Sequence, residues 1–94
     1  MTSPLGFIFS EIMPREVEIR SRAEKELAKI PRKDAGRIAE AVLHLEKGLN
    51  GDIKKLTNHT PGYRLRVGDW RVLFDVFPDR IVIQTIKHRR EAYR

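Results

Sequence analysis

Three arginines that lie close together in the sequence are predicted to share one face of a β-hairpin. Residues 63–67 and 70–77 have the apolar pattern of two strands joined by a short turn. In this hairpin Arg66 lies directly opposite Arg71, and Arg64 is on the same face. Like charges that face each other across a strand pair destabilise a sheet, so the fold gains nothing from them. Because guanidinium groups bind phosphate oxygens through paired hydrogen bonds, the cluster indicates a phosphate-binding site.

The register of this hairpin follows from its two-residue turn. Gly68 and Asp69 are the central residues, and glycine at the first central position suits a type II′ turn. The predicted pairs are Val67 with Trp70, Arg66 with Arg71, Leu65 with Val72, Arg64 with Leu73 and Tyr63 with Phe74. Tyr63, Trp70 and Phe74 are expected in the core, because alternation places them on the face opposite the arginines.

The positive charge is concentrated in the C-terminal part of the chain. The net charge is +6, and residues 1–53 carry nine basic and nine acidic side chains, so they balance. Residues 54–94 carry ten basic and four acidic side chains, which accounts for the whole excess. This distribution favours a polyanionic partner, most simply a nucleic acid, although a solubilising surface charge explains it equally well.

Residue types that bind metals or form disulfides are sparse. The 94 residues contain no cysteine, which fits a reducing compartment such as the cytoplasm. His44, His59 and His88 are scattered and have no carboxylates at metal-ligand spacing, so neither a metal nor another cofactor is predicted. No segment is long enough to span a bilayer, and Ser10 and Glu11 interrupt the apolar stretch near the N-terminus, which argues against a secretory signal.

The chain is predicted to form one folded domain with a short N-terminal extension. Residues 1–14 are interpreted as an extension of uncertain role, and residues 15–94 as the domain. The apolar side chains of the extension, such as Phe7 and Ile12, either belong to a disordered segment or cover a hydrophobic strip or sheet edge. The sequence leaves both interpretations open.

The periodicity of the domain predicts the order β-α-α-β-β-β. The expected elements are a strand at 16–20, a helix from Ser21 to Pro31, a helix at about 32–47, a loop at 52–61, and strands at about 63–67, 70–77 and 81–86. Ser21 followed by Glu24 is typical of a capping box at a helix start. The result is an α+β fold, in which a helical hairpin packs on one face of a small, mainly antiparallel sheet and the open face carries the arginines.

From about Val17 to the C-terminus the chain resembles the RelE/ParE superfamily of bacterial toxins. The matching pieces are residues 23–27, Lys55-Leu56, residues 62–72 and the ending 88–94. The resemblance implies a RelE-like toxin of a type II toxin–antitoxin system over residues 15–94. RelE-type members are metal-independent endoribonucleases that cleave mRNA in the ribosomal A site, where the RNA's 2′-hydroxyl attacks the adjacent phosphate.

The resemblance also implies roles for individual residues by motif position. Arg64 and Arg66 would grip the RNA, Arg71 would contact the phosphate, Arg89 would act as acid or charge stabiliser, and Tyr93 would be the general base. These groups match what the reaction requires: a base for the 2′-hydroxyl, an acid for the departing 5′ oxygen and fixed positive charge around the phosphate. RelE itself has lysines at the positions of Arg64 and Arg66, and a longer spacing before the tyrosine.

A second candidate for the general base is His88. Its unperturbed pKa near 6.5 suits acid–base chemistry at neutral pH, whereas a tyrosine with a pKa near 10 needs nearby cations to ionise. Tyr93 and His88 therefore both stay open as candidates. Further contacts to RNA phosphates are predicted for Lys54, Lys55 and Arg90, beside Arg64 and Arg66.

Two other functions compete with the nuclease. A ParE-like toxin, which inhibits DNA gyrase and has no nuclease site, shares the fold, so the fold alone does not choose. A basic nucleic-acid-binding module without catalysis is the third possibility. Arg71 together with the tail favours the nuclease. In the plainest interpretation the arginines form a solvated face bridged by Asp69 and Asp75, and Tyr93 only packs against the sheet edge.

The family also implies the partners. A cognate antitoxin is expected to place an amphipathic helix or a strand along the apolar grooves beside the helices or on the open sheet edge. The toxin would act on mRNA at the ribosome in the cytoplasm, and the toxin–antitoxin complex is expected to bind operator DNA. No membrane partner is expected.

Overall fold

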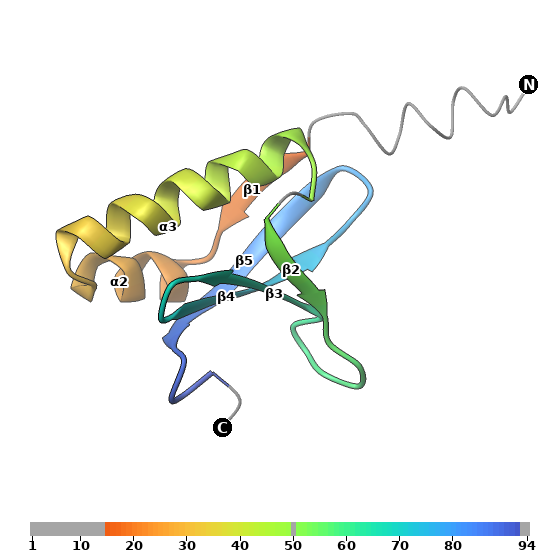
Figure 1. The fold of residues 1–94 in the computed structure, drawn as a ribbon. Coiled ribbons are helices and arrows are strands. Elements are labelled where there is room, and N and C mark those ends of the chain that lie inside the picture. Colours follow the sequence, from red (N-terminus) through yellow and green to blue (C-terminus); the bar gives the residue numbers. More distant parts are fainter. Residues whose placement is uncertain (1–14, 50, 93–94) are drawn as a thin grey trace, which may run out of the picture.

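The computed structural model describes residues 15–49 and 51–92, which form two helices and a five-stranded sheet (Figure 1). In chain order the elements are β1 (Glu16–Ile19), α2 (Ser21–Lys29), α3 (Arg32–His44), the 3-10 turn η1 (Leu45–Lys47), β2 (Asp52–Lys55), β3 (Tyr63–Val67), β4 (Trp70–Val76) and β5 (Arg80–His88). Residues 1–14, which the sequence interpretation treated as an extension, lie outside the described residues, as does Tyr93.

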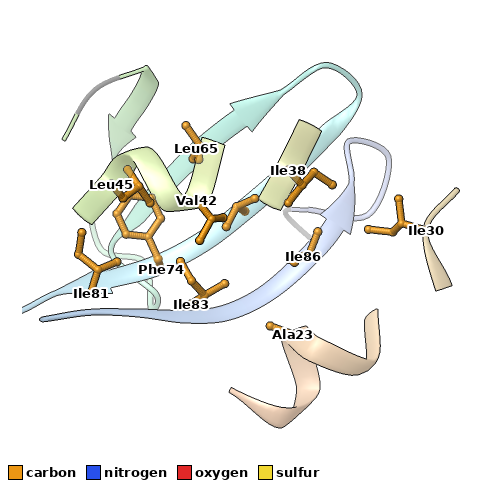
Figure 2. Packing of buried hydrophobic residues seen from close by; sticks show 11 residues of the cluster. Ala23, Ile30, Ile38, Val42, Leu45, Leu65, Phe74, Ile81, Ile83 and Ile86 are labelled. Carbon is orange, nitrogen blue, oxygen red and sulfur yellow. The ribbon is translucent and has the colours of Figure 1, made fainter. Parts of the chain in front are cut away.

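The sheet has the strand order β1-β5-β4-β3-β2. β1 runs parallel to β5, and the other three neighbouring pairs are antiparallel. Side chains from α3 and from α2 pack against one face of this sheet (Figures 1 and 2). The predicted α+β class and the mainly antiparallel sheet are therefore confirmed.

The hairpin of β3 and β4 has the predicted register at all five pairs. Gly68 has a φ of 59°, whereas Asp69 is absent from the residues with positive φ. A type I′ turn needs a positive φ at both central residues and a type II′ turn only at the first, so the turn has the type II′ pattern. Glycine adopts this conformation without the steric cost that a Cβ atom would bring.

The predicted loop at 52–61 is wrong over its first four residues, which form the edge strand β2. This segment has little strand character by itself, because Ile53 is its one apolar side chain. Pairing with β3 supplies the missing stabilisation, since Asp52 lies opposite Arg66 and Ile53 opposite Leu65. The polar segment 52–55 therefore forms a strand because β3 pairs with it and because Arg66 lies opposite Asp52.

The predicted capping box is also wrong. Arg20 is the N-cap of α2, Ser21 is already its first helical residue, and no side chain caps the helix. The Arg20 N–H donates to the Ile83 carbonyl, so Arg20 still belongs to the connection from β1. The helix therefore begins one residue away from the position that a Ser21 cap would give.

Two other elements differ in length from the prediction. The second predicted helix ends as an α-helix at His44 and continues as η1 to Lys47, and β5 is three residues longer than expected.

The core lies between the helices and the sheet. Figure 2 shows Ile38 and Val42 of α3 pointing toward side chains of β4 and β5. Phe74 and Ile83, which are opposite each other on β4 and β5, are fully buried there. Leu45 of η1 is also fully buried, which explains why the chain stays helical beyond His44. Burial of these apolar side chains is the main term that stabilises the fold.

Replacing Phe74 by alanine should cost about 3–5 kcal/mol of unfolding free energy, because the ring has no exposed surface and its loss leaves a cavity. Urea denaturation followed by circular dichroism measures this loss. Phe77→Ala is the matched control: that ring is 38% exposed and lies against the Arg80 guanidinium, so its removal should cost about 1 kcal/mol or less. Equal losses in the two variants would contradict the assigned core.

Candidate functional site

A row of three cationic residues crosses three neighbouring strands on the face away from the helices. Arg66 of β3 lies directly opposite Arg71 of β4, and Arg71 lies directly opposite Lys87 of β5. We call these three residues the basic row. Opposite residues of an antiparallel pair have Cβ atoms about 4.5–5.5 Å apart, so the charges crowd one another. Such a row costs the fold stability and suits the binding of a polyanion.

Arg71, at the centre of the basic row, is held by the turn of its own hairpin. One of its Nη atoms donates to the carbonyl of Gly68 at 2.9 Å and to the carbonyl of Trp70 at 3.0 Å. None of the ion pairs among the described residues involves Arg71. A guanidinium has five N–H donors, so Arg71 is oriented by neutral oxygens and keeps donors for an anion.

The next row on the same face contains Lys54 and Arg64, which are opposite each other on β2 and β3. The Arg64 side chain is only 15% exposed, and its Nη2 donates to Asp52 at 3.0 Å. Its Nε is buried and has no hydrogen-bond partner. Arg64 is thus a largely enclosed cation of this face, and one of its donors is unused. Lys54 is exposed.

Two further ion pairs near the basic row are long. Arg66 approaches Asp52 at 3.9 Å, and Arg89 approaches Asp69 at 3.8 Å, all with more than half of their side-chain surface exposed. Exposed pairs of this kind contribute little to stability, so an incoming phosphate can displace them. Asp75 does not bridge the arginines, because its two oxygens accept from the Gly62 N–H and the Gln84 amide.

His88 lies on the other face of the sheet from Arg71. It is opposite Trp70 across β4 and β5, and the two rings meet edge to face with centroids 5.3 Å apart. The Trp70 indole donates to Asp34 of α3, which fixes this face as the one toward the helices. His88 is predicted from the sequence to join the arginines in one site, but the structure does not bring them together.

A β-bulge explains this placement. Phe74 of β4 lies opposite Ile83 of β5, whereas its neighbour Leu73 lies opposite Thr85. One step along β4 thus corresponds to two steps along β5, and Gln84 is the extra residue. Side chains alternate between faces along a strand, so one extra residue exchanges the faces of every residue that follows. The bulge therefore moves Lys87 onto the face of Arg71 and moves His88 off it.

The tail continues from the end of β5 past the hairpin turn. The Arg89 N–H donates to the Asp69 carbonyl at 2.7 Å, and the Arg90 N–H donates to His88 Nδ1 at 3.3 Å. Arg89 and Arg90 are exposed, whereas Ala92 is only 6% exposed. These contacts direct the chain toward the hairpin turn. The placement of Tyr93 lies outside the described residues.

Lys87, which the sequence analysis omitted, is bound to a carboxylate of α2. Its Nζ is 2.9 Å from Oε2 of Glu26, while Oε1 of Glu26 accepts from the Thr85 hydroxyl at 2.7 Å and from the Ile86 N–H at 3.0 Å. Burial alone would raise the pKa of Glu26, but the hydrogen bonds from Thr85, Lys87 and Ile86 and the charge of Lys87 outweigh it and lower the pKa. The sequence signal that could have identified Lys87 is the alternation of β5 beyond Ile86. That alternation places Lys87 on the face of Arg71 only once the bulge is taken into account.

Residues 17–93 match the family model described as the ParE toxin of the type II toxin–antitoxin system parDE. The chain belongs to this toxin family. The curated Toxin RelE3 of Methanocaldococcus jannaschii is 38% identical over 42 residues, which are 45% of this chain and 48% of that protein. The match thus spans about half the length of the curated relative.

Solved structures of related toxins have the same fold. A RelB–RelE antitoxin–toxin complex from Methanococcus jannaschii matches with a TM-score of 0.69 and 26% identity, over 81% of this chain and 94% of that chain. An archaeal RelE–RelB complex from Pyrococcus horikoshii matches with a TM-score of 0.70 and 29% identity, over 85% of this chain and 100% of that one. The predicted membership of the RelE/ParE superfamily is therefore confirmed.

The toxin fold has an apolar groove on the side away from the basic row. It lies where β1, α2 and α3 meet, has a volume of about 200 Å³, and is lined by apolar residues that include Ile19, Leu27, Val42 and Leu43. Leu43 is 58% exposed and Ile19 is 37% exposed. Exposed apolar side chains that border a groove are typical of a surface that binds another protein.

Over residues 15–49 and 51–92, no group of three or more histidine or carboxylate side chains is placed to hold a metal ion. In the same part of the chain, the helices are too short or too polar to cross a membrane.

The lowered pKa of Glu26 predicts a pH-dependent contribution to stability. The carboxylate of the folded chain stays ionised below the ordinary value of 4.5, so its contribution is fully present above about pH 4.5 and is lost as the pH falls through the lowered pKa. Glu26→Gln should therefore be less stable than the native chain at pH 7, and the difference should shrink toward pH 3.

Denaturation by urea at several pH values measures this difference. Glu40→Gln, an exposed change in the interior of α3, is the control and should show almost no difference at any pH. A stability difference for Glu26→Gln that stays constant from pH 7 to pH 3 would contradict the role of its charge.

Proposed function

We propose that this protein is a ribosome-dependent endoribonuclease toxin of the RelE type. In this proposal the 2′-hydroxyl of an mRNA nucleotide attacks the adjacent phosphate, and no metal takes part. The observation that carries the proposal is the basic row, because its three cations lie directly opposite one another on adjacent strands, where like charges repel unless an anion lies between them. The RelE names of the curated relative and of the structural matches support the same class.

The cations would act mainly by electrostatic stabilisation of the reacting phosphate. As the 2′-oxygen attacks, negative charge accumulates on the non-bridging oxygens, and preorganised donors stabilise it more than they stabilise the ground state. Arg71 is suited to this role because neutral carbonyls orient it and no carboxylate competes for it. Arg64 and Arg66 would bind the same or the neighbouring phosphate, and Lys54, Lys55 and Arg90 would contact the RNA backbone farther away.

We assign the general base to Tyr93 rather than His88. The His88 imidazole packs edge to face on Trp70 on the helix side of the sheet, so it is separated from a phosphate bound at the basic row. Tyr93 belongs to the same C-terminal stretch as Arg89 and Arg90, which supports this choice. Arg89, beside the hairpin turn, would stabilise the departing 5′ oxygen.

A cognate antitoxin is the proposed protein partner. Two of the structural matches are RelE–RelB complexes more than 25% identical to this chain, which supports an antitoxin here. The apolar groove beside α2 and α3 would receive an amphipathic segment of that antitoxin, and the complex would bind operator DNA. The toxin would meet mRNA and the ribosome in the cytoplasm.

One observation favours a second function. The family model that matches residues 17–93 is named for ParE, so inhibition of DNA gyrase by binding is the alternative. Such an inhibitor needs no reacting groups at the basic row, which makes the two functions separable by substitution at Arg71.

Arg71→Gln should lower mRNA cleavage by a factor of about 10²–10³, because it removes the oriented charge at the centre of the basic row. Primer extension on a translated mRNA after induction measures cleavage within codons. Arg32→Gln, which removes the same charge at the exposed start of α3, should cleave like the native toxin. An Arg71→Gln variant that stays toxic, with intact mRNA and stalled DNA replication, would establish the gyrase function instead.

The same assay separates the two bases. Tyr93→Phe should lose about 10²–10⁴-fold in cleavage rate, as expected when a general base is removed, whereas His88→Gln should keep most of the activity. The reverse result would assign the base to His88.

Leu43→Glu should weaken binding of the antitoxin by at least about tenfold, because a charge on the groove border would have to be desolvated on binding. Co-purification and calorimetric titration with the antitoxin encoded beside the toxin measure the loss. Leu49→Glu is the matched control, since Leu49 is 39% exposed and does not line the groove. Equal weakening in both variants would remove the groove from the interface.

A further inference from the structure

Lys87 is the third cation of the basic row, and its position depends on the bulge in β5. It lies directly opposite Arg71, and its side chain is 27% exposed. Without the extra residue Gln84, alternation would turn Lys87 toward the helices. Bulges are frequent beside active sites, where they redirect a side chain. The bulge thus adds a cation to a face that already carries two opposed arginines, at a further cost in repulsion.

Glu26 reaches the edge of β5 because a strand covers only part of that edge. β1 pairs with β5 as far as Ile83, and from there α2 runs along the edge. The Ile86 N–H, which would otherwise bond a neighbouring strand, donates to Oε1 of Glu26, and the Thr85 hydroxyl donates to the same oxygen. The carboxylate is therefore fixed by two donors from β5 before it meets Lys87.

This anchoring has a consequence for the lysine. A free lysine side chain samples many rotamers, and holding it in one geometry costs conformational entropy. Oε2 of Glu26 lies 2.9 Å from the Lys87 Nζ, so the ammonium is already held in one position at the edge of β5, on the residue directly opposite Arg71. Preorganisation of this kind lowers the cost of binding a ligand.

We infer that Lys87 is a further phosphate-binding residue of the proposed RNA site, and that Glu26 is the positioning residue that holds its ammonium beside Arg71. The inference rests on the proposed function, since it names RNA as the ligand of the basic row. The bound group is a backbone phosphate of single-stranded RNA, which accepts hydrogen bonds from ammonium and guanidinium alike.

The test measures binding of the purified full chain to a 2′-O-methyl RNA oligonucleotide, which lacks the attacking hydroxyl. Fluorescence anisotropy at several salt concentrations gives the dissociation constant and its salt dependence. Lys87→Gln should weaken binding several-fold and reduce the slope of log affinity against log salt by about 0.7, the value for one phosphate contact on a single strand. Lys87→Arg should keep most of the native affinity and most of the native salt slope.

Lys33→Gln is the matched control, because it removes the same charge from an exposed position of α3, away from the basic row. Its salt slope should equal that of the native chain. Equal effects of Lys87→Gln and Lys33→Gln would overturn the inference, and so would a native chain that does not bind the oligonucleotide.

Glu26→Gln tests the positioning role. Glutamine keeps an oxygen for the Thr85 and Ile86 donors but loses the charge that holds Lys87. Binding should weaken several-fold even though the chain gains net positive charge, and the effect should vanish in the Lys87→Gln background. Unchanged or tighter binding, or the same loss in both backgrounds, would overturn the positioning role.

These outcomes are independent of catalysis. A native toxin that binds the oligonucleotide but leaves translated mRNA intact would disprove the proposed nuclease function, while the slope change of Lys87→Gln would still support the phosphate contact.

Discussion

The site depends on the pairing of three antiparallel strands that place Arg66, Arg71 and Lys87 opposite one another. Cross-strand repulsion in this row is a real cost, and the core beneath it must offset that cost. The buried pair of Phe74 and Ile83, with the side chains of α3 above them, provides the apolar contact that holds the same strands together (Figure 2). One face of the sheet therefore supplies stability, and the other keeps a charge pattern that favours an anion.

The edges of the sheet show how a small α+β domain completes its hydrogen bonds without long strands. β1 covers only the first part of β5, and Glu26 of α2 satisfies the Ile86 N–H beyond it. At the opposite edge, β2 pairs with β3 through contacts between unlike charges, with Asp52 opposite Arg66. At both edges a carboxylate that completes the sheet also pairs with a cation of the basic row: Asp52 with Arg66, and Glu26 with Lys87. The same residues therefore stabilise the fold and position the charges. Family membership fits this shared scaffold, because one fold can carry different functions on its surface groups.

Local sequence signals predicted much of the fold. The Gly68-Asp69 turn and the alternation on each side of it gave all five pairs of the β3–β4 hairpin. Signals that depend on a distant partner were missed or misread. The polar segment at 52–55 becomes a strand only beside β3, and Ser21 does not cap α2, because the connection from β1 bonds to β5. In each case a contact far along the sequence outweighs the local preference.

What the sequence by itself determined was the opposed arginines, the basic C-terminal part of the chain and the family resemblance, because these follow from residue types at short spacing. Only the tertiary structure decided which residues of β5 join the arginines. The bulge at Gln84 is an irregularity of pairing between two strands, and nothing in the local pattern marks it. Its effect is large, because one extra residue reverses the alternation and places Lys87 on the phosphate-binding face and His88 against Trp70.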